Sequence, residues 1–176
     1  LLTLRGQRIL AEADVVVYDD LVNTALLDFC PESAKRIYVG KRAGAHSMAQ
    51  IMISEILVAE AKPGVHVVRL KGGDPLGFGR GGEEMQALAE AGIRCEVVPG
   101  VTAAIAAGAS SGIPLTHRDH ASAVVFVTGH ECAGKNEKHA HVDWAALAKA
   151  GATLCIYMGV RRLPDIATAL QNGGLA

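Results

Sequence analysis

The residues with the clearest potential for chemistry form a glycine-rich segment, Lys71-Gly72-Gly73-Asp74-Pro75, which continues to Gly82. Glycine lets backbone amides approach a ligand because no Cβ stands in the way. Pro75 disfavours a helical conformation at Asp74 and so restricts where that carboxylate points. The segment matches neither a P-loop nor a dinucleotide-binding fingerprint. We interpret it either as a loop that binds a nucleotide or nucleoside or as a structural turn.

A second candidate is Asp19, which ends the apolar run Val15–Tyr18. Such a run predicts a buried strand, and open α/β sheets bind ligands at the carboxyl ends of their strands. Partial desolvation at this edge raises the pKa of a carboxyl group and makes it a better base near neutral pH. The alternative is that Asp19 caps the segment that follows it.

Basic and titratable side chains follow the second and third predicted strands and a later proline-containing segment. Arginine suits carboxylate ligands because its N–H groups bind in pairs. The set therefore either binds a polycarboxylate or consists of scattered surface charges; its members are Lys41, Arg42, Arg80, His117, Arg118 and His120. Thr102 and Ala103 begin a predicted helix. The unpaired backbone N–H groups of its first turn can bind an anion or the polar edge of a ligand.

Short apolar runs alternate with helical patterns, which predicts an α/β fold with a mostly parallel sheet. We expect strands at 15–18, 36–39, 65–70, 95–98, 123–128 and 152–157, with helices at 3–13, 48–62, 83–91, 101–111, 143–150 and 161–172. The irregular segment 113–121 predicts a linker between a first lobe, 1–112, and a partial second lobe, 122–176. Because two strands make a marginal sheet, we expect the second lobe to be truncated or completed by a partner.

Composition excludes several classes of protein. The formal net charge of −1 over 176 residues provides no global attraction to nucleic acid or to a membrane surface. No apolar run approaches the ~20 residues of a membrane span. Four separated cysteines indicate reduced thiols in a cytosolic protein. Because the chain begins at Leu1 inside a helical pattern, we expect it to be processed or partial.

Longer strings add specificity because they occur in one order along nearly the whole chain. They are Ala13–Asp19, Val39–Gly44, Val68–Pro75, Phe78–Glu84, Val98–Ala104, Gly112–Asp119, Val127–His130 and Tyr157–Gly159. Together they resemble the uroporphyrinogen-III C-methyltransferases of the tetrapyrrole methylase family. The resemblance implies two α/β lobes with an active site in the cleft between them, and a cytoplasmic homodimer.

The resemblance also implies an activity: methylation of uroporphyrinogen III by S-adenosylmethionine, through precorrin-1 to precorrin-2, for siroheme and cobalamin synthesis, with S-adenosylhomocysteine as the other product and no metal. It implies a proton acceptor at Asp19 and a proton donor at Lys41. It places the methyl donor at Gly72, Gly73, Asp74, Gly77, Thr102, Ala103 and Met158. The substrate's carboxylates would then meet Arg42, Arg80, His117 and Arg118.

The chain departs from the family pattern at three places. The family's Gly-Pro-Gly-Asp-Pro loop is expected just before Leu1 and is absent from this sequence. Gly77 stands where a bulkier apolar residue is usual, and Asp20 replaces a usual arginine beside Asp19. Two further interpretations stay open: a methylase of a later precorrin, and a truncated protein that binds S-adenosyl ligands without catalysis.

Overall fold

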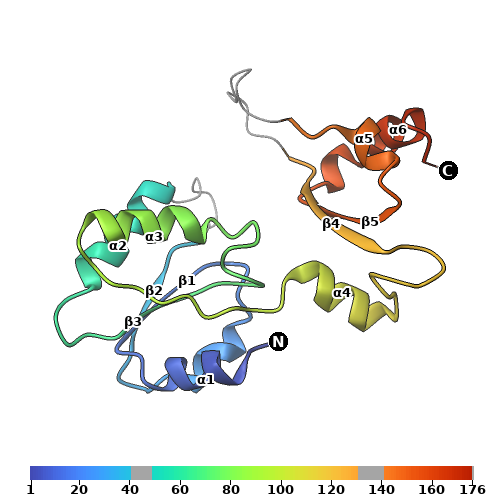
Figure 1. Cartoon of the computed structure of the whole chain (residues 1–176). Helices are drawn as coiled ribbons and strands as arrows, with labels where there is room; N and C mark the ends of the chain where they lie inside the picture. Colours follow the sequence, from blue (N-terminus) through green and yellow to red (C-terminus); the bar gives the residue numbers. More distant parts are fainter. Residues whose placement is uncertain (41–48, 131–140, 176) are drawn as a thin grey trace. The chain divides into compact units, whose positions relative to one another are not determined.

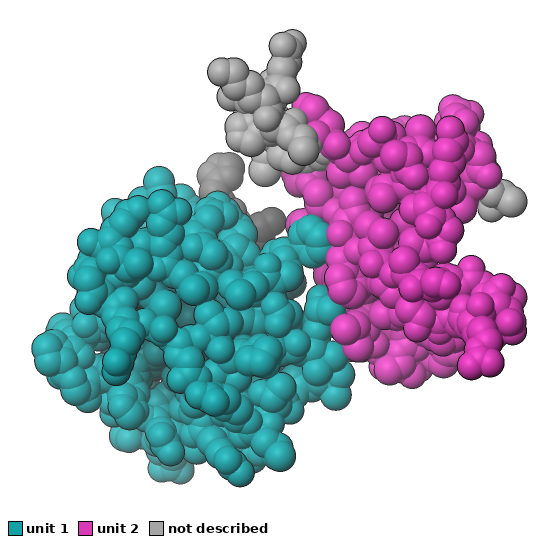
Figure 2. Space-filling model, in the orientation of Figure 1, with its two compact units in different colours: residues 1–103 teal, residues 104–176 magenta. Residues whose placement is uncertain are grey.

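The computed structural model describes residues 1–40, 49–130 and 141–175. These residues form two compact units, 1–103 and 104–176 (Figure 2). The expected first lobe ended at residue 112, nine residues beyond this boundary. The difference arises because most of the helix after Pro99-Gly100 belongs to the second unit.

A three-stranded parallel sheet lies at the centre of the first unit. Its strands are β1 (Val15–Tyr18), β2 (Lys35–Tyr38) and β3 (Val67–Leu70), in the order β2-β1-β3. Helices α2 (Gln50–Glu60) and α3 (Gly81–Glu90) cover one face, and α1 (Leu4–Ala11) covers the other (Figure 1). The predicted α/β class is therefore confirmed.

The apolar run of β1 is explained by burial on both faces of this sheet. Val16 packs in a cluster with Leu10 of α1 and with Leu27, which lies in the 3₁₀ helix η1 (Thr24–Phe29). Val15 and Val17 pack on the opposite side with apolar residues of α2. Successive side chains of a strand point to opposite faces, so a central strand with a helix on each side must be apolar throughout.

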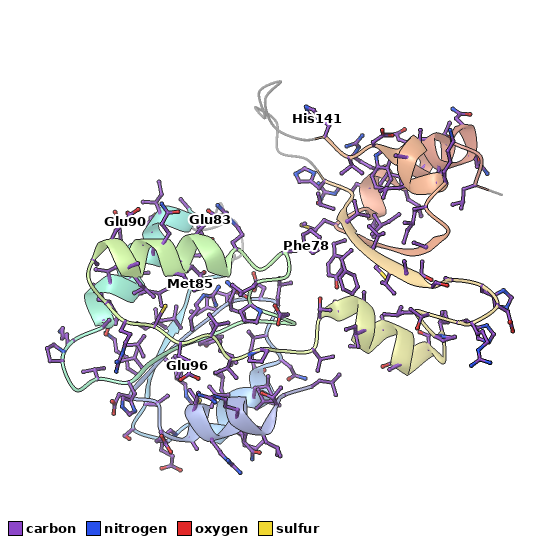
Figure 3. The ribbon with its side chains drawn as sticks, viewed as in Figure 1. Phe78, Glu83, Met85, Glu90, Glu96 and His141 are labelled. Carbon is purple, nitrogen blue, oxygen red and sulfur yellow. The ribbon has the colours of Figure 1, made fainter. Side chains whose placement is uncertain are left out.

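The predicted strand at 95–98 is wrong: this segment has no regular structure. A cavity of about 620 Å³ separates it from β3, and both segments line that cavity. Figure 3 labels two of the lining residues, Met85 of α3 and Glu96 of this segment. A strand exists only through backbone pairing, and in the part of the chain that the structure describes no strand lies beside these residues.

The second unit has a smaller parallel sheet, formed by β4 (Ala123–Thr128) and β5 (Ala152–Tyr157). Helices α4 (Ala103–Ser111), α5 (Trp144–Ala148) and α6 (Leu163–Asn172) accompany it, and a 3₁₀ turn, η2 (Val160–Arg162), precedes α6. The two-stranded sheet is as the sequence predicts. Within the described ranges, no helix is both long and apolar enough to cross a membrane.

Candidate functional site

The parallel register of β1 and β3 determines which side chains can meet at the edge of the first sheet. Val17 lies opposite Arg69, and Val17 faces the side covered by α2. Since paired residues in a sheet share a face, Arg69 also faces the side of the covering helices. Its side chain is 11% exposed, so a full positive charge lies within the layer between sheet and helices.

Arg69 uses all three of its guanidinium nitrogens. Nη2 donates to Oδ2 of Asp19 at 2.6 Å, and Nε donates to Oε1 of Glu84 at 3.3 Å. Nη1 donates to the carbonyl oxygens of Leu70 at 2.7 Å and Val17 at 3.4 Å. A planar guanidinium bound on every side has one orientation available to it.

Glu84, in the first turn of α3, is the buried anion of this group, with 4% of its surface exposed. Its carboxylate also accepts from Nζ of Lys71 at 3.0 and 3.2 Å and from Nε2 of Gln50 at 3.0 Å. Desolvation and the neighbouring Arg69 lower the pKa of Lys71, although the hydrogen bond to Glu84 opposes them. Asp19, Arg69, Lys71 and Glu84 form what we call the charge cluster, which holds two cations and two anions.

Asp19 occupies the expected position, directly after β1. Its Oδ1 accepts from the backbone N–H of Leu21 at 3.0 Å, and its side chain remains 22% exposed. The alternative role as a helix cap is wrong, because Asn23 caps the following 3₁₀ helix. The sequence did not predict a partner for Asp19, and the structure pairs it with Arg69.

The glycine-rich loop after β3 packs directly against the segment that carries Asp19. A Cβ added to Gly72 would lie 2.3 Å from the carbonyl oxygen of Leu21, a backbone atom, so that one of the two loops would have to shift. Glycine at this position therefore permits the two loops to touch. The structure thereby brings together Asp19 and Gly72, two candidates 53 positions apart in the sequence.

The carboxylate of Asp74 fixes this loop by accepting hydrogen bonds from backbone amides. Its Oδ1 accepts from the amides of Leu76 at 2.9 Å and Gly77 at 3.0 Å, and its Oδ2 accepts from Gly100 at 3.1 Å. Desolvation tends to raise the pKa of Asp74, but these amide hydrogen bonds together outweigh it, and the pKa lies below its ordinary value. The sequence predicts that the Asp74 carboxylate contacts a ligand. In the structure this carboxylate fixes the loop to the segment before Thr102.

The neighbouring glycines differ in how much space they leave. Gly73 has a left-handed φ of 76°, and a Cβ added to Gly100 would lie 2.1 Å from the carbonyl oxygen of Gly73. A Cβ added to Gly77 would meet only ordinary contacts, with Asp74 and Thr102 at 3.7 Å. The bulkier apolar residue expected at position 77 would therefore meet no backbone obstruction at its Cβ.

Three non-glycine residues among those described have left-handed backbone angles: Phe78, Arg80 and Met158, with φ between 56° and 58°. Such angles cost energy for bulky residues and gather at functional sites. Phe78 and Arg80 lie in the loop before α3 (Figure 3 labels Phe78), and Met158 directly follows β5 in the second unit. The Met158 side chain is large, apolar and exposed, as a ligand contact can be.

Two of the predicted substrate-binding residues, Arg80 and His117, have partners of their own. Arg80 donates to both carboxylate oxygens of Glu83, at 2.8 and 2.6 Å, and this pairing lowers the pKa of Glu83. His117 and Arg118 are exposed in a short turn of the second unit, where Nδ1 of His117 accepts from the amide of Asp119 at 3.2 Å. The predicted residues Lys41 and Arg42 lie outside the described residues.

Asp20 is exposed beside Asp19 and accepts a hydrogen bond from the hydroxyl of Tyr38 on β2. This hydrogen bond is the main cause that raises the pKa of Tyr38. Asp20 and Asp19 therefore have separate partners, on the two strands that flank β1. The expected pair of adjacent acids does not form one carboxyl–carboxyl site.

Sequence reasoning missed Arg69, Lys71 and Glu84 as members of the site. A signal was present: two cations occupy alternate positions at the end of a predicted buried strand. Buried charges require partners, and the next helix begins with two glutamates, Glu83 and Glu84. Choosing between them requires the helix orientation, which the spacing alone does not supply.

Comparison with known proteins identifies the family of the chain. The family model described as Tetrapyrrole (Corrin/Porphyrin) Methylases matches residues 1–175. The chain belongs to the tetrapyrrole methylase family. A solved structure of uroporphyrin-III C-methyltransferase from Thermus thermophilus, in complex with S-adenosylhomocysteine, matches this methylase with a TM-score of 0.77. The two are 41% identical, over 99% of this chain and 71% of that one.

Curated relatives of this tetrapyrrole methylase are more similar in sequence. The siroheme synthase of Baumannia cicadellinicola is 55% identical over the whole of this chain, which spans 37% of that protein. The S-adenosyl-L-methionine-dependent uroporphyrinogen III methyltransferase of Methanosarcina barkeri is 52% identical, again over the whole chain and over 68% of its own length. The chain therefore spans just over a third of the siroheme synthase and about two thirds of the methyltransferase.

Proposed function

We propose that the chain forms the core of an enzyme that transfers methyl groups from S-adenosylmethionine to uroporphyrinogen III, giving precorrin-2 through precorrin-1. The observation that carries the proposal is the packing of Gly72 against Leu21, which puts a fixed carboxylate, Asp19, beside an open glycine loop. The names and identities of the relatives support this substrate over a later precorrin.

The residues present fit an S-adenosyl ligand. Gly72 and Gly73 are exposed and present backbone without side chains, and Gly77 leaves space beside Thr102. Gly73, Asp74 and Ala103 would complete the loop side of that site, and Met158 would supply an apolar contact. When bound, S-adenosylmethionine provides an electrophilic methyl group on a sulfonium.

Asp19 would accept the proton that the methylated macrocycle must lose. A C–H bond of the macrocycle breaks, its electron pair returns to the ring, and the proton passes to the carboxylate. Lys41 would act as the proton donor, and Arg42, Arg80, His117 and Arg118 would meet substrate carboxylates. Positioning and proton transfer are contributions that protein side chains can make to such a reaction.

Asp19→Asn tests this assignment. We expect turnover of uroporphyrinogen III to fall by about 10²-fold or more, while calorimetry gives an unchanged dissociation constant for S-adenosylhomocysteine. Wild-type turnover in this variant would refute Asp19 as the base. Binding without turnover in the unmodified protein would instead favour a non-catalytic S-adenosyl-binding protein.

We also propose that the protein acts as a cytoplasmic homodimer that serves siroheme or cobalamin synthesis. The support is the family resemblance, together with the incomplete two-stranded sheet of the second unit. Light scattering of the purified protein tests the oligomeric state. A mass equal to one chain would contradict the homodimer.

A further inference from the structure

The structure assigns Arg69 as a positioning residue for the proposed proton transfer: it holds the Asp19 carboxylate in one orientation, and the buried Glu84 holds Arg69 in turn. This inference rests on the proposed function, because it gives Asp19 its role as proton acceptor. It adds two residues to that site which the sequence reasoning did not select.

Hydrogen bonds hold the Asp19 carboxylate at both of its oxygens. Each of its carboxylate oxygens has one donor: Oδ1 the amide of Leu21 at 3.0 Å, and Oδ2 the guanidinium of Arg69 at 2.6 Å. A carboxylate has about four acceptor positions, so two donors fix its plane and leave others for a substrate proton. The side chain is 22% exposed, which leaves it accessible.

Arg69 itself has no freedom to reorient. Its side chain is 11% exposed, and Glu84 and two backbone carbonyls bind the nitrogens that do not face Asp19. Glu84 is 4% exposed and comes from α3, so the helix layer determines where the guanidinium lies. The orientation of Asp19 is thereby set by a residue of α3, 65 positions along the chain.

The charges of the cluster balance one another. With Asp19 ionised, two carboxylates face two cations, Arg69 and Lys71. Tyr18, Asp20 and Tyr38 are further titratable groups described near Asp19, and Tyr38 donates a hydrogen bond to Asp20. Removal of the Arg69 charge leaves Lys71 as the single described cation of the cluster, and a carboxyl with less positive charge beside it binds a proton at higher pH.

Arg69→Met and Arg69→Lys test the inference in the full-length protein. Methionine removes the charge, so we expect the acid limb of the kcat profile to move to higher pH by about one unit or more. Lysine keeps the charge but lacks the planar set of N–H donors of a guanidinium, so we expect a smaller shift of the acid limb. We also expect kcat to fall about tenfold or more, because a point charge does not orient a carboxylate. The dissociation constant for S-adenosylhomocysteine should stay within about twofold of wild type in both variants, since neither removes a proposed donor contact.

Arg5→Met is the matched control, because Arg5 is 65% exposed on α1 and pairs only with Glu96 among the described acids. We expect it to leave kcat and its pH profile unchanged. A folded Arg69→Met variant with the wild-type acid limb would overturn the inference, even if activity fell evenly at every pH. Should that variant fail to fold, full kcat in Arg69→Lys would overturn it.

Asp19→Asn separates this inference from the function on which it rests. Wild-type turnover in Asp19→Asn would refute the base assignment and the positioning role together. An inactive Asp19→Asn variant, with an unshifted profile in Arg69→Met, would refute the positioning role alone.

Discussion

Replacing Gly100 by alanine is a sharp test of how the candidate site is built. The added Cβ would lie 2.1 Å from the carbonyl oxygen of Gly73 and 3.3 Å from Cα of Asp74. Both are backbone atoms, so relief requires a loop shift on the order of 1 Å, and overpacking of this kind costs about 3 kcal/mol. The shift would also weaken the hydrogen bond from Gly100 to Asp74, worth about 1.5 kcal/mol. Because Gly100 has no left-handed φ, the cost comes from contact and not from backbone strain.

We expect Gly100→Ala to lower the free energy of unfolding by about 3–5 kcal/mol in urea titrations. Its dissociation constant for S-adenosylhomocysteine should rise at least about tenfold in calorimetry, which corresponds to about 1.4 kcal/mol. Gly77→Ala is the matched stability control, since its Cβ meets nothing closer than 3.7 Å, and we expect a change within about 0.5 kcal/mol. Gly82→Ala, with nothing within 4 Å, is the control for binding. The reasoning is refuted if Gly100→Ala unfolds within about 1 kcal/mol of wild type.

Two further predictions concern the carboxylates that hold the site together. Glu84→Gln should destabilise the protein by about 3 kcal/mol, because it leaves Arg69 and Lys71 with one anion in a buried setting. The control is Glu90→Gln, at the exposed far end of α3 (Figure 3), which should change stability by less than about 0.5 kcal/mol. Equal effects of the two substitutions in urea titrations would contradict the charge cluster. Asp74 has a lowered pKa when folded, so its stabilising effect is complete above the ordinary carboxyl pKa and is lost as pH falls through the folded value. The stability difference between wild type and Asp74→Asn should therefore be constant above about pH 5 and shrink below about pH 4. A difference that does not depend on pH in thermal unfolding would show that the ionised carboxylate of Asp74 does not stabilise the loop.

The strands show how far local patterns predict structure in this chain. The runs 15–18, 123–128 and 152–157 match β1, β4 and β5 residue for residue. For β1 the reason is burial on both faces, which requires consecutive apolar side chains. The run 95–98 has the same kind of pattern but forms no strand. The apolar pattern is present, but among the described residues no neighbouring strand pairs with this segment. Whether such a neighbour exists depends on the assembled sheet.

In the site, likewise, the sequence predicts where residues lie but not which residues they bind. The location of Asp19 at the end of β1 and the importance of the Gly72–Asp74 loop follow from the sequence, as does membership of the tetrapyrrole methylase family. The sequence also suggests that Arg80 is available for a substrate, whereas its guanidinium pairs with Glu83. Asp74 was expected to contact a ligand, and its carboxylate binds three amides of its own chain.

The sequence by itself therefore determined the α/β class, the family and the segments that carry chemistry, because these follow from short local patterns and from their order along the chain. Tertiary structure alone decided that Arg69 fixes Asp19, that Glu84 and not Glu83 balances the buried cations, and that Gly72 must be glycine. The physical reason is that these pairings join residues 13 to 51 positions apart. Their geometry depends on strand register and helix orientation, which are set only when the layers pack together.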